Sequence, residues 1–72
     1  MITFSELINN VEFDDGLLVR VWDEESETYL MDYANYDELT EEKRNLLKNL
    51  EVTHIYPYSI PPYSAVVVEL RW

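Results

Sequence analysis

Cysteine is absent from this chain of 72 residues, and glycine and histidine occur once each. Without cysteine, neither a disulfide nor a thiolate-bound zinc ion can reinforce the fold, so the core depends on packing alone. A chain of this length forms one domain, residues 1–72, and buries only about 60% of the surface that its unfolded form exposes. We therefore expect a single small domain with a narrow margin of stability.

The scarcity of glycine and histidine also argues against catalysis and nucleotide binding. An activated nucleophile needs a base beside it, and His54 lies in a segment with strand character. Phosphate-binding loops need several glycines at the start of a helix, and Gly16 stands alone. Acidic residues alternate from Asp23 to Glu27, but the glycine and the last glutamate of a calcium-binding EF-hand loop have no counterparts. We expect a non-enzymatic protein with no metal or cofactor.

Basic residues are few as well, since 5 Lys and Arg stand against 15 Asp and Glu for a net charge of -10. This charge disfavours binding to nucleic acid and to anionic membranes, which are themselves negative. The amino terminus has no basic segment leading into an apolar run, and no apolar run reaches the roughly 18 residues that span a bilayer. We expect a soluble, cytoplasmic protein that binds basic protein surfaces, with no direct contact to nucleic acid or membrane.

Apolar spacing predicts two short helices. Thr3 and Glu6 have the spacing of a capping box, and apolar residues follow at helical spacing from Phe4 to Val11. The dipeptide before Gly16, Asp14-Asp15, adds a turn signal after this helix. A second apolar stripe predicts the other helix, and its members are Leu39, Leu46, Leu47 and Leu50.

Alternation predicts two strands that form a hairpin. The first runs over residues 17–23 and the second over residues 28–33, with the polar run 24–27 as the loop between them. On the second strand, strict alternation places Tyr29, Met31 and Tyr33 on one face. A third strand over residues 51–56 has apolar residues three apart, which predicts a bulge.

The last strand, from Ser64 to Trp72, is apolar along one face and along half of the other. Such a strand needs neighbours on both sides, so it should lie inside the sheet. Trp72 at its end is either an apolar plug in the core, which is favoured, or an exposed anchor. Three prolines, Pro57, Pro61 and Pro62, should confine the segment before it to an extended link. The order helix-strand-strand-helix-strand-strand predicts the α+β class: a small four-stranded, mainly antiparallel sheet with two helices packed on one face.

Charge is distributed unevenly, because nine acidic residues and no basic residue lie between positions 21 and 42. One interpretation is a surface that serves solubility. The other is a binding surface, in which tyrosines bury area against a basic partner while the carboxylates steer its approach. The predicted partner-binding residues are Asp23, Glu24, Glu25, Glu27, Tyr29, Asp32, Tyr33, Tyr36, Asp37 and Glu38.

A second aromatic group, Tyr56, Tyr58 and Tyr63, lies around the prolines. It has two interpretations of equal weight: a surface that binds a peptide or a second copy, or a lid packed over the end of the sheet. Arg20 and Arg71 are each expected to meet an acidic residue across the sheet, which would be a structural role.

Three segments carry a resemblance to known proteins: Glu6-Leu7-Ile8 in the first helix, Leu18–Trp22, and a closing segment with Val52, Ile55 and Pro57 before Val67–Leu70. In them the chain resembles short proteins of unknown function encoded by phages and mobile elements of low-GC Gram-positive bacteria. The tyrosine-rich middle departs from that pattern. In size and charge the chain is also similar to small acidic phage proteins, including anti-CRISPR proteins and other anti-defence inhibitors, which occupy basic grooves of nucleic-acid-handling host proteins.

Two functional hypotheses follow. In the first, the protein is a phage-type inhibitor that binds a basic, nucleic-acid-binding host protein by nucleic-acid mimicry. Acidic residues on one face of a strand recur about every 6.6 Å, close to the charge spacing of a phosphate chain. In the alternative, the protein is an interaction or assembly module, such as a homodimer formed through the last strand or the prolines, and its charge serves only solubility.

Overall fold

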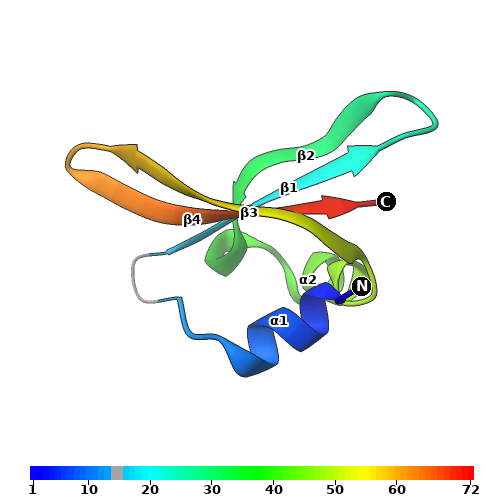
Figure 1. The fold of residues 1–72 in the computed structure, drawn as a ribbon, viewed down its shortest axis with the longest axis horizontal. Helices are drawn as coiled ribbons and strands as arrows, with labels where there is room; N and C mark the ends of the chain where they lie inside the picture. The colour runs from blue at the N-terminus through cyan, green and yellow to red at the C-terminus, as the bar shows by residue number, and fades with distance from the viewer. Residues whose placement is uncertain (14–15) are drawn as a thin grey trace.

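Four strands form one sheet in the order β2-β1-β4-β3 in the computed structural model, which describes residues 1–13 and 16–72 (Figure 1). The α+β class and the predicted order of helices and strands are confirmed, with one added 3-10 helix, η1. The elements are α1 Phe4–Asn10, β1 Leu17–Asp23, β2 Thr28–Asn35, η1 Tyr36–Glu38, α2 Glu41–Leu47, β3 Glu51–Ile60 and β4 Tyr63–Arg71.

Strand β4 lies inside the sheet, as its apolar pattern predicts. It pairs in parallel with β1 and antiparallel with β3, and Val67, Val68 and Leu70 have no exposed surface. Trp72, expected in the core, is instead 59% exposed. It follows the last residue of β4, and although its backbone N–H still donates to the Trp22 carbonyl at 2.8 Å, its side chain finds no cover there.

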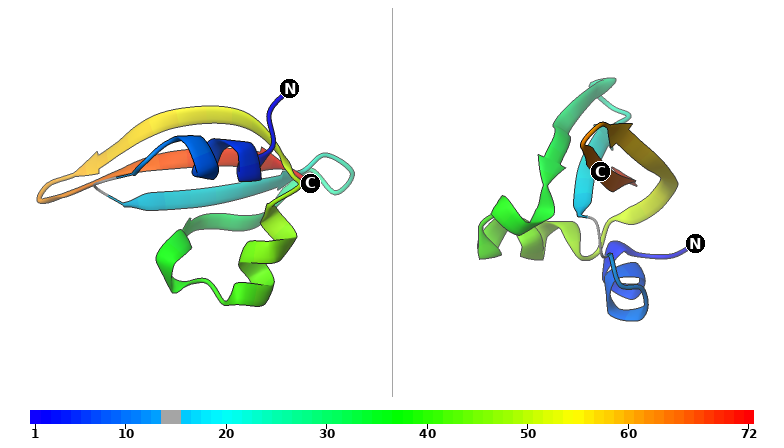
Figure 2. Two further views of the ribbon diagram at one scale, coloured as in Figure 1. Left: turned by 90° about the horizontal axis from the view of Figure 1, so that it is seen from below. Right: turned by 90° about the vertical axis from the view of Figure 1, so that its left-hand side faces the viewer.

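Both helices lie on the same face of the sheet (Figures 1 and 2). Phe4 and Leu7 of α1 and Leu47 of α2 are buried against the alternate residues of β1 and β4 that point to this side. The predicted capping box is confirmed, because the Thr3 hydroxyl accepts from the Glu6 amide and the Glu6 carboxylate accepts from the Thr3 amide. These contacts form the main core. The sheet residues in it are Leu17, Val19, Val21, Val68 and Leu70.

Helix α2 is shorter than its apolar stripe suggests. The Thr40 hydroxyl caps it by accepting from the Lys43 amide at 3.2 Å, and only Leu47 of its seven residues is buried. Leu46, expected in the apolar stripe, is exposed. A helix of two turns presents too narrow a face to bury both leucines. No helix in the described part of the chain is long and apolar enough to cross a membrane.

Strand β3 extends beyond the predicted end at residue 56. It continues through Pro57 to Ile60, and Pro61-Pro62 forms the turn into β4. The predicted extended link is therefore a hairpin, because proline is tolerated on an edge strand where its missing N–H is not needed by a neighbour. The predicted bulge is confirmed by a register shift between Val52 and His54. Gly16 has φ 114°, as a turn residue should, while Asp14 and Asp15 lie outside the described residues.

Candidate functional site

The acidic segment does not occupy one continuous surface. Its first four carboxylates lie at the tip of the β1–β2 hairpin, where residues 24–27 form a turn and not a strand. Asp32 follows within β2, opposite Arg20, and the others lie in η1 and in the first turn of α2 on the helix side of the sheet (Figure 1). The acidic residues that were expected to share one binding surface are thus separated along β2. The residues at the hairpin tip are Asp23, Glu24, Glu25 and Glu27.

Tyr36, Asp37 and Glu38 form η1 and lie apart from the other predicted site residues. Tyr36 packs against the main core, with its ring 5.5 Å from that of Phe4 in an edge-to-face contact. The guanidinium of Arg44 donates to the backbone carbonyls of Tyr36 and Asp37 at 3.2 and 2.8 Å. Tyr36 therefore has a structural role, which corrects its expected place among the exposed anchors.

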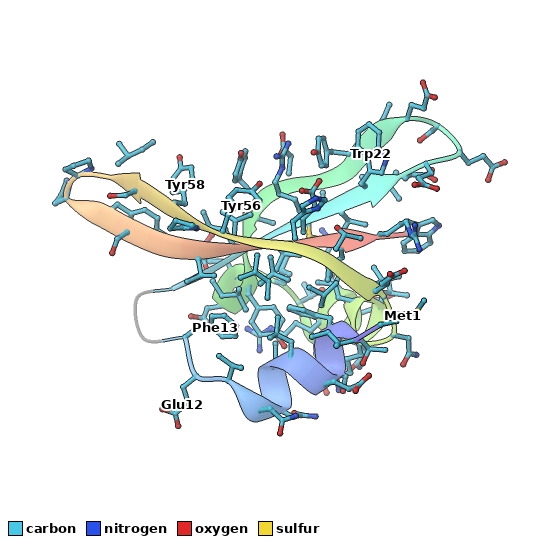
Figure 3. The ribbon with its side chains drawn as sticks, in the orientation of Figure 1. Met1, Glu12, Phe13, Trp22, Tyr56 and Tyr58 are labelled. Carbon is cyan, nitrogen blue, oxygen red and sulfur yellow. The ribbon has the colours of Figure 1, made fainter. Side chains whose placement is uncertain are left out.

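Tyr29 and Tyr33, by contrast, lie on the face of the sheet that no helix covers. Figure 3 shows Trp22, Tyr56 and Tyr58 projecting from this same face, opposite α1 and α2. Beneath them lies a small second core of Leu18, Ala65 and Val67, against which Tyr56 and Tyr58 pack. The second aromatic group thus includes residues that cover part of the sheet, as one of its two interpretations predicted. We call this surface the open face; its residues are Arg20, Trp22, Tyr29, Tyr33, His54, Tyr56, Tyr58, Tyr63 and Glu69.

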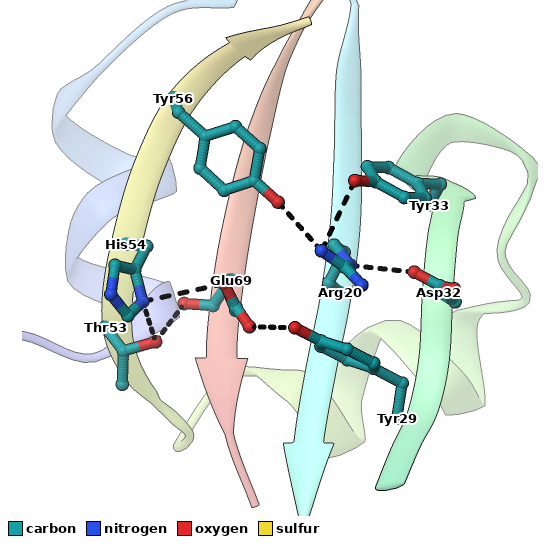
Figure 4. Close-up of polar contacts among 8 residues, drawn as sticks. All are labelled: Arg20, Tyr29, Asp32, Tyr33, Thr53, His54, Tyr56 and Glu69. Atoms are coloured by element: carbon teal, nitrogen blue, oxygen red, sulfur yellow. Dashed lines mark hydrogen bonds and ion pairs between the residues drawn. The ribbon is translucent and has the colours of Figure 1, made fainter.

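Arg20 lies at the centre of the open face (Figure 4). Its Nε donates to the Asp32 carboxylate at 2.7 Å, and its Nη1 donates to the hydroxyls of Tyr33 and Tyr56 at 3.3 and 3.2 Å. Its guanidinium carbon also lies 3.7 Å from the ring centre of Tyr29 and 4.4 Å from that of Tyr33. The predicted ion pair of Arg20 is confirmed, and this one side chain joins residues of β1, β2 and β3.

A bulge in β2 allows two consecutive residues of this strand to contact the Arg20 guanidinium. At the first of two register shifts in the β1–β2 pairing, both Asp32 and Tyr33 lie opposite the single residue Arg20, and Tyr33 has φ 49°. Neighbouring strand residues normally point to opposite faces, but here both contact the same guanidinium. The bulges also separate Met31, which packs against the main core, from Tyr29. The prediction that Tyr29, Met31 and Tyr33 share one face is therefore wrong.

Glu69 of β4 is the second ionised group of the open face, and it pairs in register with Arg20. Its side chain is only 14% exposed and lies 3.5 Å from His54 Nδ1. The Tyr29 hydroxyl donates to its Oε1 at 2.8 Å, which ties β2 to β4 across β1 (Figure 4). Arg71 of β4 pairs with Glu51 and lies 3.8 Å from Glu24, so its predicted contact with an acidic residue is also confirmed.

Aromatic rings form a band along the open face. The ring of Trp22 lies 4.8 Å from that of Tyr29, Tyr33 lies 5.4 Å from Tyr58, and Tyr58 lies 6.4 Å from Tyr63. These edge-to-face and tilted contacts are the favoured geometries of aromatic pairs. Tyr29 and Tyr33 nevertheless remain 36% and 41% exposed, so the band is available to a partner.

Hydrogen bonding and charge alter the acidity of two of these tyrosines. The hydrogen bond to Glu69, together with desolvation and the negative charge of that carboxylate, raises the pKa of Tyr29 above its ordinary value. The neighbouring Tyr56 hydroxyl, with a smaller contribution from desolvation, raises the pKa of Tyr33. Desolvation lowers the pKa of Arg20, but hydrogen bonds and charges from Tyr56 and Asp32 raise it overall, so the guanidinium stays charged.

These shifts predict a loss of stability at alkaline pH. The pKa of Tyr29 is higher in the folded state than in the unfolded state. The contribution of its hydroxyl to the free energy of unfolding is therefore complete below the unfolded-state pKa of about 10 and disappears as pH rises through the folded-state pKa. Urea unfolding between pH 9 and pH 12 should show a falling free energy of unfolding, with a shallower fall in Tyr29→Phe. An unchanged pH dependence in Tyr29→Phe would show that its hydroxyl makes no such contribution.

Trp22 borders two hollows near the hairpin end of the open face. One, of about 370 Å³, is lined by Trp22, Glu24, Tyr29, Thr53, His54, Glu69 and Arg71. The other, of about 500 Å³, is lined by Trp22, Glu24 and Glu27. Among residues 1–13 and 16–72, no three His, Cys, Asp or Glu side chains are grouped so that they could hold a metal ion.

The chain matches no protein-family model, no curated protein and no solved structure. The open face is therefore the feature from which function can be inferred. Sequence reasoning missed Trp22 and Glu69 as members of a site and gave Arg20 only a structural role. One signal could have found this site: Arg20 and Glu69 place charges on one face of two otherwise apolar central strands, which is typical of a face that no helix covers.

Proposed function

We propose that this protein is a non-enzymatic binding protein that receives a basic protein surface on its open face. The observation that carries the proposal is the exposed aromatic band on the side of the sheet opposite both helices. Tyrosine and tryptophan are enriched at protein interfaces because they bury large areas and lose little conformational entropy. An exposed aromatic surface of this kind suits a protein partner.

Charge supports a basic partner. The net charge of -10 steers cationic surfaces toward the molecule and repels nucleic acid. The hairpin carboxylates Glu24 and Glu27 border the open face beside Trp22, so acidic groups lie next to the aromatic anchors. The proposed binding residues therefore include Tyr29, Tyr33 and the hairpin acids. It leaves Tyr36, Asp37 and Glu38 outside the interface.

The homodimer alternative had two possible interfaces, the last strand and the prolines, and the strand order argues against the first. Strand β4 is hydrogen-bonded to β1 on one side and to β3 on the other, so it cannot pair with a second copy along its length. Two copies that each carry a charge of -10 also repel each other. The same charge gives more support to a basic partner of a different sequence.

Affinity capture with matched variants tests the proposal. The double variant Tyr33→Ser, Tyr63→Ser removes two exposed anchors of the open face, and Leu46→Ser, Val11→Ser removes two exposed apolar residues elsewhere. Captured proteins, identified by mass spectrometry, should be basic. Their affinity should fall at least about tenfold in the tyrosine variant, since one interface hot spot is worth about 2 kcal/mol. The control variant should bind like the wild type, and each variant's fold is checked by circular dichroism.

Salt and competition address the finer hypothesis of an inhibitor. Binding to a basic surface should weaken as salt rises, because exposed charges are screened beyond about 10 Å at 0.1 M. If the captured partner is a nucleic-acid-binding protein, its nucleic acid should compete for the same site. Capture that is indifferent to the tyrosine variant would contradict the proposed face, and a captured set without excess basic charge would contradict the proposed partner.

A further inference from the structure

The hollows beside Trp22 suggest what this end of the open face recognises. Trp22 and Glu24 border both of them, and Trp22 remains partly exposed. Tyr29 contributes a second aromatic wall to the smaller hollow through its edge-to-face contact with Trp22. The aromatic surface here is therefore open to a side chain from outside the molecule.

The ionised groups around Trp22 are predominantly acidic. Glu24 borders both hollows, Glu27 borders the larger and Glu69 the smaller. The cation in the smaller hollow, Arg71, is already paired with Glu51. After that pair is discounted, the remaining carboxylates leave the site with an excess of negative charge.

We propose that the Trp22 hollows receive an arginine side chain of the partner. This inference rests on the proposed function and specifies its central contact. The guanidinium would stack on the Trp22 indole, which binds cations best among the aromatic rings, and would pair with the Glu24 carboxylate. Glu24 is available because its contact with Arg71 is long, at 3.8 Å, and its side chain is mostly exposed.

Arginine fits this site better than lysine. A guanidinium is planar, so it stacks on an indole while its edge donates two hydrogen bonds to one carboxylate. An ammonium is a compact, strongly hydrated charge that does neither. The chain already shows the arginine geometry on the same face, where the Arg20 guanidinium lies over Tyr29 and donates to Asp32.

Fluorescence of Trp22 provides a direct test. All proteins carry Trp72→Phe, so that the remaining tryptophan reports on the hollows. Hexa-arginine and hexalysine peptides of equal charge are titrated into this background. The double variant Glu24→Gln, Glu27→Gln removes two charges at the site, and Glu41→Gln, Glu42→Gln removes two exposed charges from the first turn of α2 on the other side of the sheet.

Hexa-arginine should change the emission of Trp22 and bind several-fold more tightly than hexalysine. The Glu24, Glu27 variant should lose about tenfold in affinity, as expected for loss of one charge-assisted contact, while the Glu41, Glu42 variant should lose less than about twofold. Equal losses in the two variants would show attraction to net charge alone and would overturn the proposal. Equal affinity for the two peptides would overturn the choice of arginine.

Capture of the protein partner separates this inference from the proposed function. If the Tyr33, Tyr63 variant loses the partner while the Glu24, Glu27 variant retains it, the open face binds but the arginine site is wrong. If both variants retain the partner, the open face is not the interface and the proposed function fails. Loss of the partner in both variants, together with the peptide preference, supports both.

Discussion

Replacing Phe4 by alanine should lower the free energy of unfolding by about 3–5 kcal/mol. Phe4, the first residue of α1, has no exposed surface and packs against the sheet and against Tyr36 of η1. Truncation of a fully buried phenylalanine costs about 3–5 kcal/mol, through lost burial and the cavity left behind. At about 0.05–0.15 kcal/mol per residue, 72 residues provide only about 4–11 kcal/mol in total. The substitution therefore removes a large part of the stability.

Urea unfolding followed by circular dichroism measures this effect as a lower midpoint with an unchanged slope. The matched control is Phe13→Ala, which truncates the same residue type at a half-buried position against the same core. Its loss should be less than half that of Phe4→Ala. Equal losses at the two positions would show that Phe4 does not hold η1 and α1 to the sheet in the way described.

Replacing Arg20 by methionine should lower the free energy of unfolding by about 2–3 kcal/mol, because it removes hydrogen bonds to a charged group and two cation–π contacts. The Arg20 side chain is 16% exposed and its partner Asp32 is 54% exposed, so the pair is partly screened and the loss stays below that of a fully buried pair. Arg20→Lys should lose about 1–2 kcal/mol, since an ammonium cannot replace the planar fork of donors.

The control for this prediction is Arg71→Met, which removes the same residue type from the adjacent strand. Its side chain is more exposed than that of Arg20, and surface ion pairs contribute at most about 1 kcal/mol. Near-ultraviolet circular dichroism should also change in Arg20→Met, because the guanidinium orders the rings of Tyr29 and Tyr33. An Arg20→Met protein as stable as the wild type would show that the network contributes nothing to stability.

Periodicity was enough to predict most of the fold. The run Val66–Leu70 requires cover on both sides, and β4 lies between β1 and β3. The spacing of Thr3 and Glu6 predicts the cap of α1. These features depend on near neighbours in the chain, so the sequence carries them directly. The end of α2 and the exposure of Trp72 depend instead on which distant residues supply cover.

The candidate site was predicted only in part. Tyr29 and Tyr33 were expected to contact a partner, and the structure places both on the open face. Tyr36 was expected to do the same, but it packs against Phe4. Strict alternation also placed Met31 on the same face as these two tyrosines, but the bulges in β2 leave Met31 packed against the main core. A bulge depends on pairing between two strands, and strict alternation cannot reveal it. Grouping the acids by position in the chain likewise overlooked that β2 separates the hairpin tip from η1.

The contacts around Arg20 have a consequence for the thermodynamics of recognition. Tyr29, Tyr33 and Tyr56 are held by one guanidinium, so their rotamers are restricted before any partner arrives. Ordering a free side chain at an interface costs about 0.5–1.5 kcal/mol. Here that entropy is lost when the chain folds, so a rigid surface is presented and association carries a smaller entropic penalty.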